Sequence, residues 1–106
     1  MFKVVIMPIA EADIGEAYEW WHEHRSAEQA KRWYQEIYVA VQGLSESAAR
    51  RPLSPEAAKL GVDIREFYFG IGTYPTHRVV FTIENATIKV LRVLHLARGR
   101  LQLSDL

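Results

Sequence analysis

The hydrophobic and polar positions of this chain change their period along its length, from helical steps in the first half to alternation in the second. Over residues 9–24, apolar side chains recur at three- and four-residue steps with acidic residues on the other side, which predicts an amphipathic helix. Ser26 and Gln29 then have the spacing of a capping box, and a second apolar stripe predicts another helix that runs to about residue 48 and ends before two prolines. Because only a few residues join these helices, they should pack as an antiparallel hairpin.

Four short runs rich in β-branched and aromatic residues predict strands, at residues 2–6, 62–70, 77–84 and 87–96. A bend with Pro75 and a tight turn at Asn85, a residue that tolerates positive φ, join the last three runs. Strands joined this closely are antiparallel. The predicted fold is therefore a single α+β domain over residues 1–106, of order β-α-α-β-β-β, with the helical hairpin packed on a mostly antiparallel, twisted four-stranded sheet.

Composition excludes several classes of site. The 106 residues suit one domain with one core, and the absence of cysteine excludes disulfides, thiolate metal sites and thiol nucleophiles. No apolar run is long enough for a signal peptide or a membrane span. We therefore expect a cytoplasmic protein that does not bind membranes.

The net charge is zero, but it is unevenly distributed. Residues 1–49 hold four basic and eight acidic residues, which gives −4, whereas residues 50–106 hold nine and five, which gives +4. The basic half is the half that forms most of the predicted sheet. A local positive face can therefore exist on a neutral protein, although simple solvation of these charges explains them equally well.

Three short motifs follow one another in the predicted strands: Ile-Arg-Glu-Phe at 64–67, His-Arg-Val-Val-Phe at 77–81 and Val-Leu-Arg-Val-Leu-His-x-x-Arg at 90–98. Their order and spacing resemble the RelE/ParE superfamily of type II toxin-antitoxin toxins, and the resemblance covers nearly the whole chain, from Phe2 to about Arg100. It implies a cytoplasmic toxin of the plasmid-stabilisation type that a cognate antitoxin neutralises. In this superfamily RelE-like members cleave messenger RNA on the ribosome, and ParE-like members poison DNA gyrase.

The resemblance also implies positions for a nuclease site. Arg65, Arg78 and Arg98 stand where RelE has a strand lysine, its central strand arginine and its late arginine. However, Asp63 replaces the other strand lysine, and the last residues offer no tyrosine or histidine for proton transfer, a task for which arginine is poorly suited because its pKa lies above 12. The ending Leu-His-x-x-Arg looks like ParE, so we favour a gyrase-binding toxin. A ribosome-dependent messenger-RNA endonuclease is the alternative, and a non-toxic protein-binding module is a third interpretation.

The arginines of the sheet half are the first candidates for binding an antitoxin or a target. If Arg65, Arg78 and Arg92 share the face away from the helices, they form a basic groove suited to an acidic segment or to phosphates. Simple alternation also places Arg92 on one face with Val90 and Leu94. The competing interpretation is that these arginines pair with neighbouring acids, as Arg65 can with Glu66 or Asp63. The full candidate set is Arg65, His77, Arg78, Arg92, His95, Arg98, Arg100 and Trp20.

Trp20 joins this set because adjacent residues of a helix point about 100° apart, so either Trp20 or Trp21 should be at least partly exposed. An exposed tryptophan favours contact with a partner protein or with a second copy of this chain. Arg98 and Arg100 flank Gly99 in a short tail, which suits a partner contact as well as a solvated terminus.

The four histidines do not indicate a metal site. His77 lies beside a candidate arginine, and His95 at the end of an apolar strand suits a structural hydrogen bond. His22, Glu23 and His24 fall on different sides of the first helix, so they do not have the spacing of metal ligands. The sequence predicts neither a metal nor a cofactor.

Overall fold

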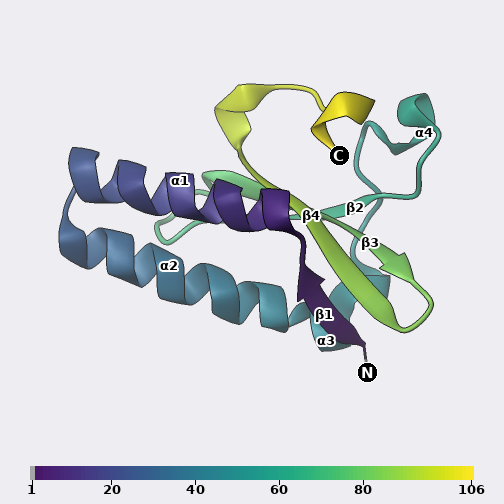
Figure 1. The fold of residues 1–106 in the computed structure, drawn as a ribbon, viewed down its shortest axis with the longest axis horizontal. Helices are drawn as coiled ribbons and strands as arrows, with labels where there is room; N and C mark the ends of the chain where they lie inside the picture. The colour runs from purple at the N-terminus through teal and green to yellow at the C-terminus, as the bar shows by residue number, and fades with distance from the viewer. Residues whose placement is uncertain (1) are drawn as a thin grey trace.

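The computed structural model describes residues 2–106, and its elements follow the predicted order (Figure 1). The strands are β1 (Lys3–Ile6), β2 (Arg65–Phe69), β3 (His77–Glu84) and β4 (Thr87–His95). The helices are α1 (Pro8–His24), α2 (Ala27–Gln42), α3 (Leu44–Ser47) and α4 (Ala57–Leu60), with single 3-10 turns η1 (Ala48–Arg50), η2 (Leu96–Arg98) and η3 (Leu103–Asp105).

The four strands form one sheet in the order β1-β4-β3-β2. β2, β3 and β4 are antiparallel neighbours, and β1 lies parallel to β4, with Lys3 opposite Thr87 and Ile6 opposite Val90. The paired helices α1 and α2 lie side by side against the sheet (Figure 1). The predicted α+β fold with a mostly antiparallel sheet is therefore confirmed.

Several predicted boundaries were too long. α2 ends at Gln42 and a separate short helix follows Gly43, because glycine in a helix interior is less favourable than other residues. β2 begins only at Arg65, since the Ile64 carbonyl accepts a hydrogen bond from the Ser54 N–H at 2.9 Å instead of joining the sheet. β4 ends at His95, one residue earlier than expected, where η2 begins.

The local signals at the turns are confirmed. Ser26 caps α2 by accepting a hydrogen bond from the Gln29 N–H at 3.1 Å, which satisfies a donor that the helix leaves unpaired. Asn85 adopts φ 56° in the tight turn between β3 and β4.

Hydrophobic side chains cover both faces of the sheet. The larger core lies between the helices and the sheet and includes Trp33, Ile37 and Phe81, all fully buried. A smaller cluster on the opposite face joins Val80 and Leu94 of the sheet to side chains of the segment before β2 and of the C-terminal tail: Ala57, Ile64 and Leu101. The face away from the helices is thus covered in part by the chain itself.

A β-bulge in β4 changes which side chains share a face. Val80 lies opposite Arg92 but Phe81 lies opposite Val90, so Leu91 is an extra residue in the ladder. Val90 therefore packs in the larger core, whereas Arg92 lies opposite a residue of the smaller cluster. The prediction that Arg92 and Val90 share a face was wrong because simple alternation does not anticipate a bulge.

Candidate functional site

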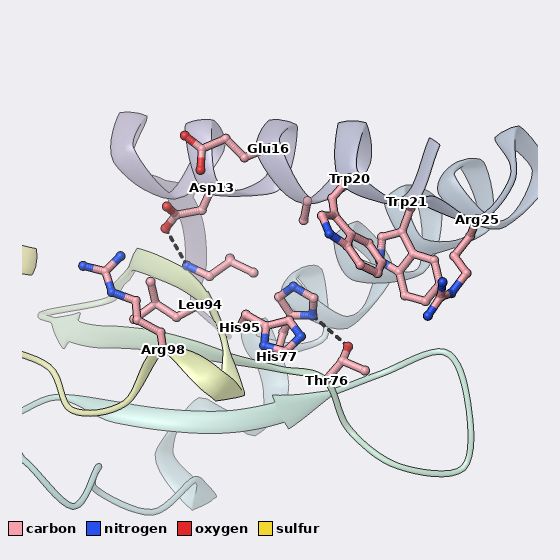
Figure 2. Close-up of a pocket in the computed structure, with 12 residues that line it drawn as sticks. Asp13, Glu16, Trp20, Trp21, Arg25, Thr76, His77, Leu94, His95 and Arg98 are labelled. Carbon is pink, nitrogen blue, oxygen red and sulfur yellow. Dashed lines mark hydrogen bonds between the residues drawn. The ribbon is translucent and has the colours of Figure 1, made fainter. Parts of the chain in front are cut away.

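A groove lies between α1 and the neighbouring ends of β3 and β4 (Figure 2). Its volume is about 670 Å³, within the range of sites that bind ligands. It is lined by Asp13, Glu16, Ala17, Trp20, Trp21 and Arg25 of the first helix and its end, and by Thr76, His77, Val93, Leu94, His95 and Arg98.

One flank of α1 forms a wall of the groove. Asp13, Glu16 and Trp20 follow at three- and four-residue steps and so lie along one side of the helix. Tyr18 lies on the other flank, where its ring contacts Tyr34 of α2 at 5.4 Å between centroids. Trp20 is 45% exposed, which confirms that one of the two tryptophans is accessible.

Two histidines on adjacent strands line the groove next to this wall. His77 and His95 are Cα partners across β3 and β4, and their ring centroids lie 5.1 Å apart. His77 also packs against the buried Trp33 at 5.1 Å, and its Nδ1 lies 2.7 Å from the Thr76 hydroxyl oxygen. Burial lowers the pKa of His77 to about 4, with His95 adding to the shift, so His77 is neutral near pH 7.

His95 presents a hydrogen-bond donor. Its Nδ1 accepts a hydrogen bond from the Ala97 N–H at 3.0 Å. A ring nitrogen that accepts carries no proton, so we assign the proton of the neutral ring to Nε2. His95 therefore cannot remove a proton through Nε2 while this contact is kept.

An arginine lies at each end of the groove, with the two histidines between them (Figure 2). Arg25 lies over the Trp20 ring at 5.3 Å and donates to the His24 carbonyl at 3.1 Å. Arg98 pairs with Asp105, and its side chain is 44% exposed. A guanidinium has five N–H donors, so both arginines can bind further acceptors.

Asp13 fastens α1 to β4. β1 pairs with β4 only as far as Val90, and beyond it the Val93 N–H donates to the Asp13 carboxylate at 2.9 Å. Arg92 donates to both oxygens of the same carboxylate, at 2.8 and 3.0 Å, and to the Asp105 carbonyl at 2.7 Å. The Asp13 charge is thus matched inside the protein, and Arg92 links the helix to the tail.

Arg78 is a buried hub, in contrast to the predicted basic face. Its guanidinium donates to Glu56 at 2.7 and 2.9 Å and to Glu66 at 2.9 Å, and the residue is 7% exposed. The hydrogen bonds from Arg78 lower the pKa of Glu56 to about 2 despite burial, and the same contacts raise the pKa of Arg78. Glu56 also accepts from the Leu101 N–H at 3.0 Å, which holds the tail on the sheet.

Arg65 lies on the opposite face of the sheet from Arg78. It is opposite Phe81 of the larger core, so its side chain leaves the sheet on the helix side, and it donates to the Arg51 carbonyl at 2.6 Å rather than to Glu66 or Asp63. The condition for one outward basic groove, that Arg65, Arg78 and Arg92 share the face away from the helices, is therefore not met. Two of them are buried against carboxylates, and the third is on the other face.

Four of the sequence candidates meet in the groove: Trp20, His77, His95 and Arg98. Arg92 adjoins it through Asp13. Arg100 is exposed and lines a smaller hollow of about 280 Å³ beside Arg78, whereas Arg65 lines neither hollow.

Sequence reasoning missed other lining residues, notably Asp13, Glu16, Trp21, Arg25 and Thr76. The spacing along α1 could have indicated Asp13 and Glu16, because it places them on one flank of the helix with Trp20. No comparable signal existed for Thr76, which reaches the groove only through the pairing of β3 with β4.

Within residues 2–106, no group of three or more histidine, aspartate or glutamate side chains is placed to hold a metal ion. No helix in that part of the chain has the length and apolar character needed to cross a membrane.

The element order, the mixed sheet and the helical hairpin form the α+β fold that the sequence predicted. A chain of the solved structure described as the chromosomal ParDE TA system from P. aeruginosa superposes with a TM-score of 0.73 and 19% sequence identity, over 90% of this chain and 96% of that one. At this identity the likeness establishes the fold. No protein-family model and no curated protein sequence matches the chain.

Proposed function

We propose that this protein is the cytoplasmic toxin of a type II toxin-antitoxin system and that a cognate antitoxin holds it inactive. The observation that carries the proposal is the structural likeness to a chain of the P. aeruginosa ParDE system, which extends over nearly the whole of both chains. The order of the strand motifs supports the same assignment independently.

We further propose that the toxin acts by binding DNA gyrase rather than by cutting RNA. RNA cleavage requires groups that move protons and groups that stabilise charge on the transition state, placed around one phosphate. Arg78 is enclosed by two carboxylates, and Arg65 leaves the sheet on the opposite face from it. Arg98, the third candidate, lines the groove and pairs with Asp105. Three guanidinium groups separated in this way do not supply that arrangement, which favours inhibition by binding.

Expression of the chain in bacteria that lack an antitoxin tests the function. We expect growth arrest, and we expect the purified protein to inhibit supercoiling by gyrase or to trap cleaved DNA. Primer extension on messenger RNA from the arrested cells should reveal no new cuts within codons. Unchanged growth would contradict the toxin assignment, and growth arrest with codon cuts but normal gyrase activity would establish the endonuclease instead.

A further inference from the structure

The connection between β2 and β3 is longer than a hairpin requires. Residues 85–86 join β3 to β4 in a two-residue turn of the commonest kind, whereas residues 70–76 join β2 to β3. In Figure 2 this loop continues beyond Thr76, away from the two histidines of the groove. It carries Tyr74, which is 80% exposed. Loops held on a rigid scaffold frequently supply binding residues, so the contacts that hold this one bear on its function.

The two ends of the loop are packed tightly together. Gly70 allows this, because a Cβ atom at that position would lie 2.6 Å from the Tyr74 carbonyl oxygen and 2.8 Å from the Pro75 Cα. The Thr76 N–H also donates to the Phe69 carbonyl at 2.9 Å, which closes the loop at its base. A larger residue at position 70 would therefore displace the backbone that carries Tyr74.

Two further contacts attach the loop to the helices and the core. Arg32 of α2 donates to the Ile71 carbonyl at 2.9 Å, and the Ile71 side chain packs against the larger core. The backbone on both sides of Tyr74 is thus held in place before a partner binds. A tyrosine presented in this way loses little conformational freedom on binding beyond that of its own side chain, which lowers the entropic cost of association.

The surroundings of Tyr74 favour a protein partner over a nucleic acid. Residues 70–76 contain no charged side chain. Beside them Arg32 pairs with Glu36 at 2.6 Å, and Arg25 lines the groove together with Thr76. Binding to DNA or RNA depends on several cations along the phosphate backbone, which this surface does not supply. The loop therefore suits a partner surface of low charge.

We propose that Tyr74 inserts into a preformed apolar pocket on the folded protein that the toxin inhibits, where its hydroxyl group meets a hydrogen-bond partner. The inference rests on the proposed function, under which such a target exists. A folded target has concave, largely preformed apolar pockets, whereas a segment that becomes ordered only on binding presents none beforehand. Tyrosine is common among the residues that dominate binding energy, because it combines a large apolar ring with a polar group.

Substitutions at Tyr74 test the proposal in two assays, growth arrest on expression and inhibition of supercoiling by purified gyrase. Y74A should relieve the arrest and raise the half-inhibitory concentration about tenfold or more, the loss typical of a residue that anchors an interface. Y74F keeps the ring and removes the hydroxyl group, so we expect a rise of about threefold. V39A shortens a side chain of α2 that is 73% exposed, and as the matched control it should leave both readouts unchanged.

Three outcomes would overturn the proposal: activity of Y74A equal to that of the original chain, a dimer of the original chain that Y74A dissociates in sedimentation equilibrium, and binding of a duplex DNA fragment that Y74A abolishes. Circular dichroism and thermal denaturation verify that each variant is folded.

The growth assay separates this inference from the proposed function. Growth arrest by the original chain and by Y74A alike would refute only the inference. If the original chain does not arrest growth, the toxin assignment fails and the inference fails with it. If it arrests growth without inhibiting gyrase, the target is a different protein, and the comparison of growth with Y74A decides the role of Tyr74.

Discussion

The arginines in the groove differ in burial and in hydrogen bonding from the arginine on the outer face of the sheet. On the outer face Arg78 is buried between Glu56 and Glu66. Its hydrogen bonds hold the segment before β2 and the C-terminal tail to the sheet. In the groove Arg25 and Arg98 are exposed, and each keeps donors that solvent or a partner can reach. A guanidinium enclosed by carboxylates organises the fold, whereas one with donors to spare is available for recognition.

The largest effect should come from breaking the buried hub. R78M leaves Glu56 and Glu66 buried without their cation, and such a loss typically destabilises a protein by about 3–5 kcal/mol. Urea denaturation measures the change. Adding E56Q and E66Q to R78M should recover much of the stability, because no buried charge is then left unmatched. A loss below about 1 kcal/mol for R78M would show that the hub does not organise this face.

A smaller loss should follow removal of the Asp13 carboxylate. D13A leaves the Val93 N–H without its acceptor and removes one of the two acids that Arg92 contacts. Because Asp105 still faces Arg92, we expect a destabilisation of about 2–3 kcal/mol rather than the full cost of an unpaired buried charge. D105A, compared by urea denaturation, separates the two contacts. Equal stability of D13A and the original chain would contradict the role of Asp13 in joining α1 to β4.

The buried histidine predicts how stability depends on pH. The pKa of His77 is about 4 in the folded protein and near 6.5 when unfolded, so between these values the unfolded chain binds more protons. Stability should therefore fall by about 2 kcal/mol between pH 7.5 and 5. Glu56 adds a second loss below about pH 4.5, where its unfolded form becomes protonated.

H77Q supplies the control for this pH dependence. It should abolish most of the loss above pH 5 and leave the loss below pH 4.5 unchanged. A pH profile of the denaturation midpoint that is identical in H77Q and the original chain would contradict the burial of a neutral imidazole.

The smallest effect on stability should come from the groove arginine. Arg25 is exposed and makes one hydrogen bond and one contact with an aromatic ring, so R25Q should change the free energy of unfolding by no more than about 0.5 kcal/mol. Thermal denaturation checks this. A loss comparable to that of D13A would assign Arg25 to the fold rather than to recognition.

Much of the fold was predictable from the sequence, and less of the site. Periodicity and turn residues such as Ser26 and Asn85 act over a few positions, so they are readable without tertiary information. The burial of Arg78 against Glu56 could not be predicted, because Glu56 lies 22 residues away in a segment without clear secondary-structure signals. The bulge at Leu91 likewise separated Arg92 from the face of Val90, and this was not readable because register depends on pairing between strands.

The most direct test of the contrast between the two faces makes the same substitution on each. R78M removes the arginine of the buried hub, and R25M removes an exposed arginine of the groove. The measurement is the free energy of unfolding, by urea denaturation at neutral pH. The account predicts a loss of about 3–5 kcal/mol for R78M and of no more than about 0.5 kcal/mol for R25M; equal losses in the two variants would contradict it.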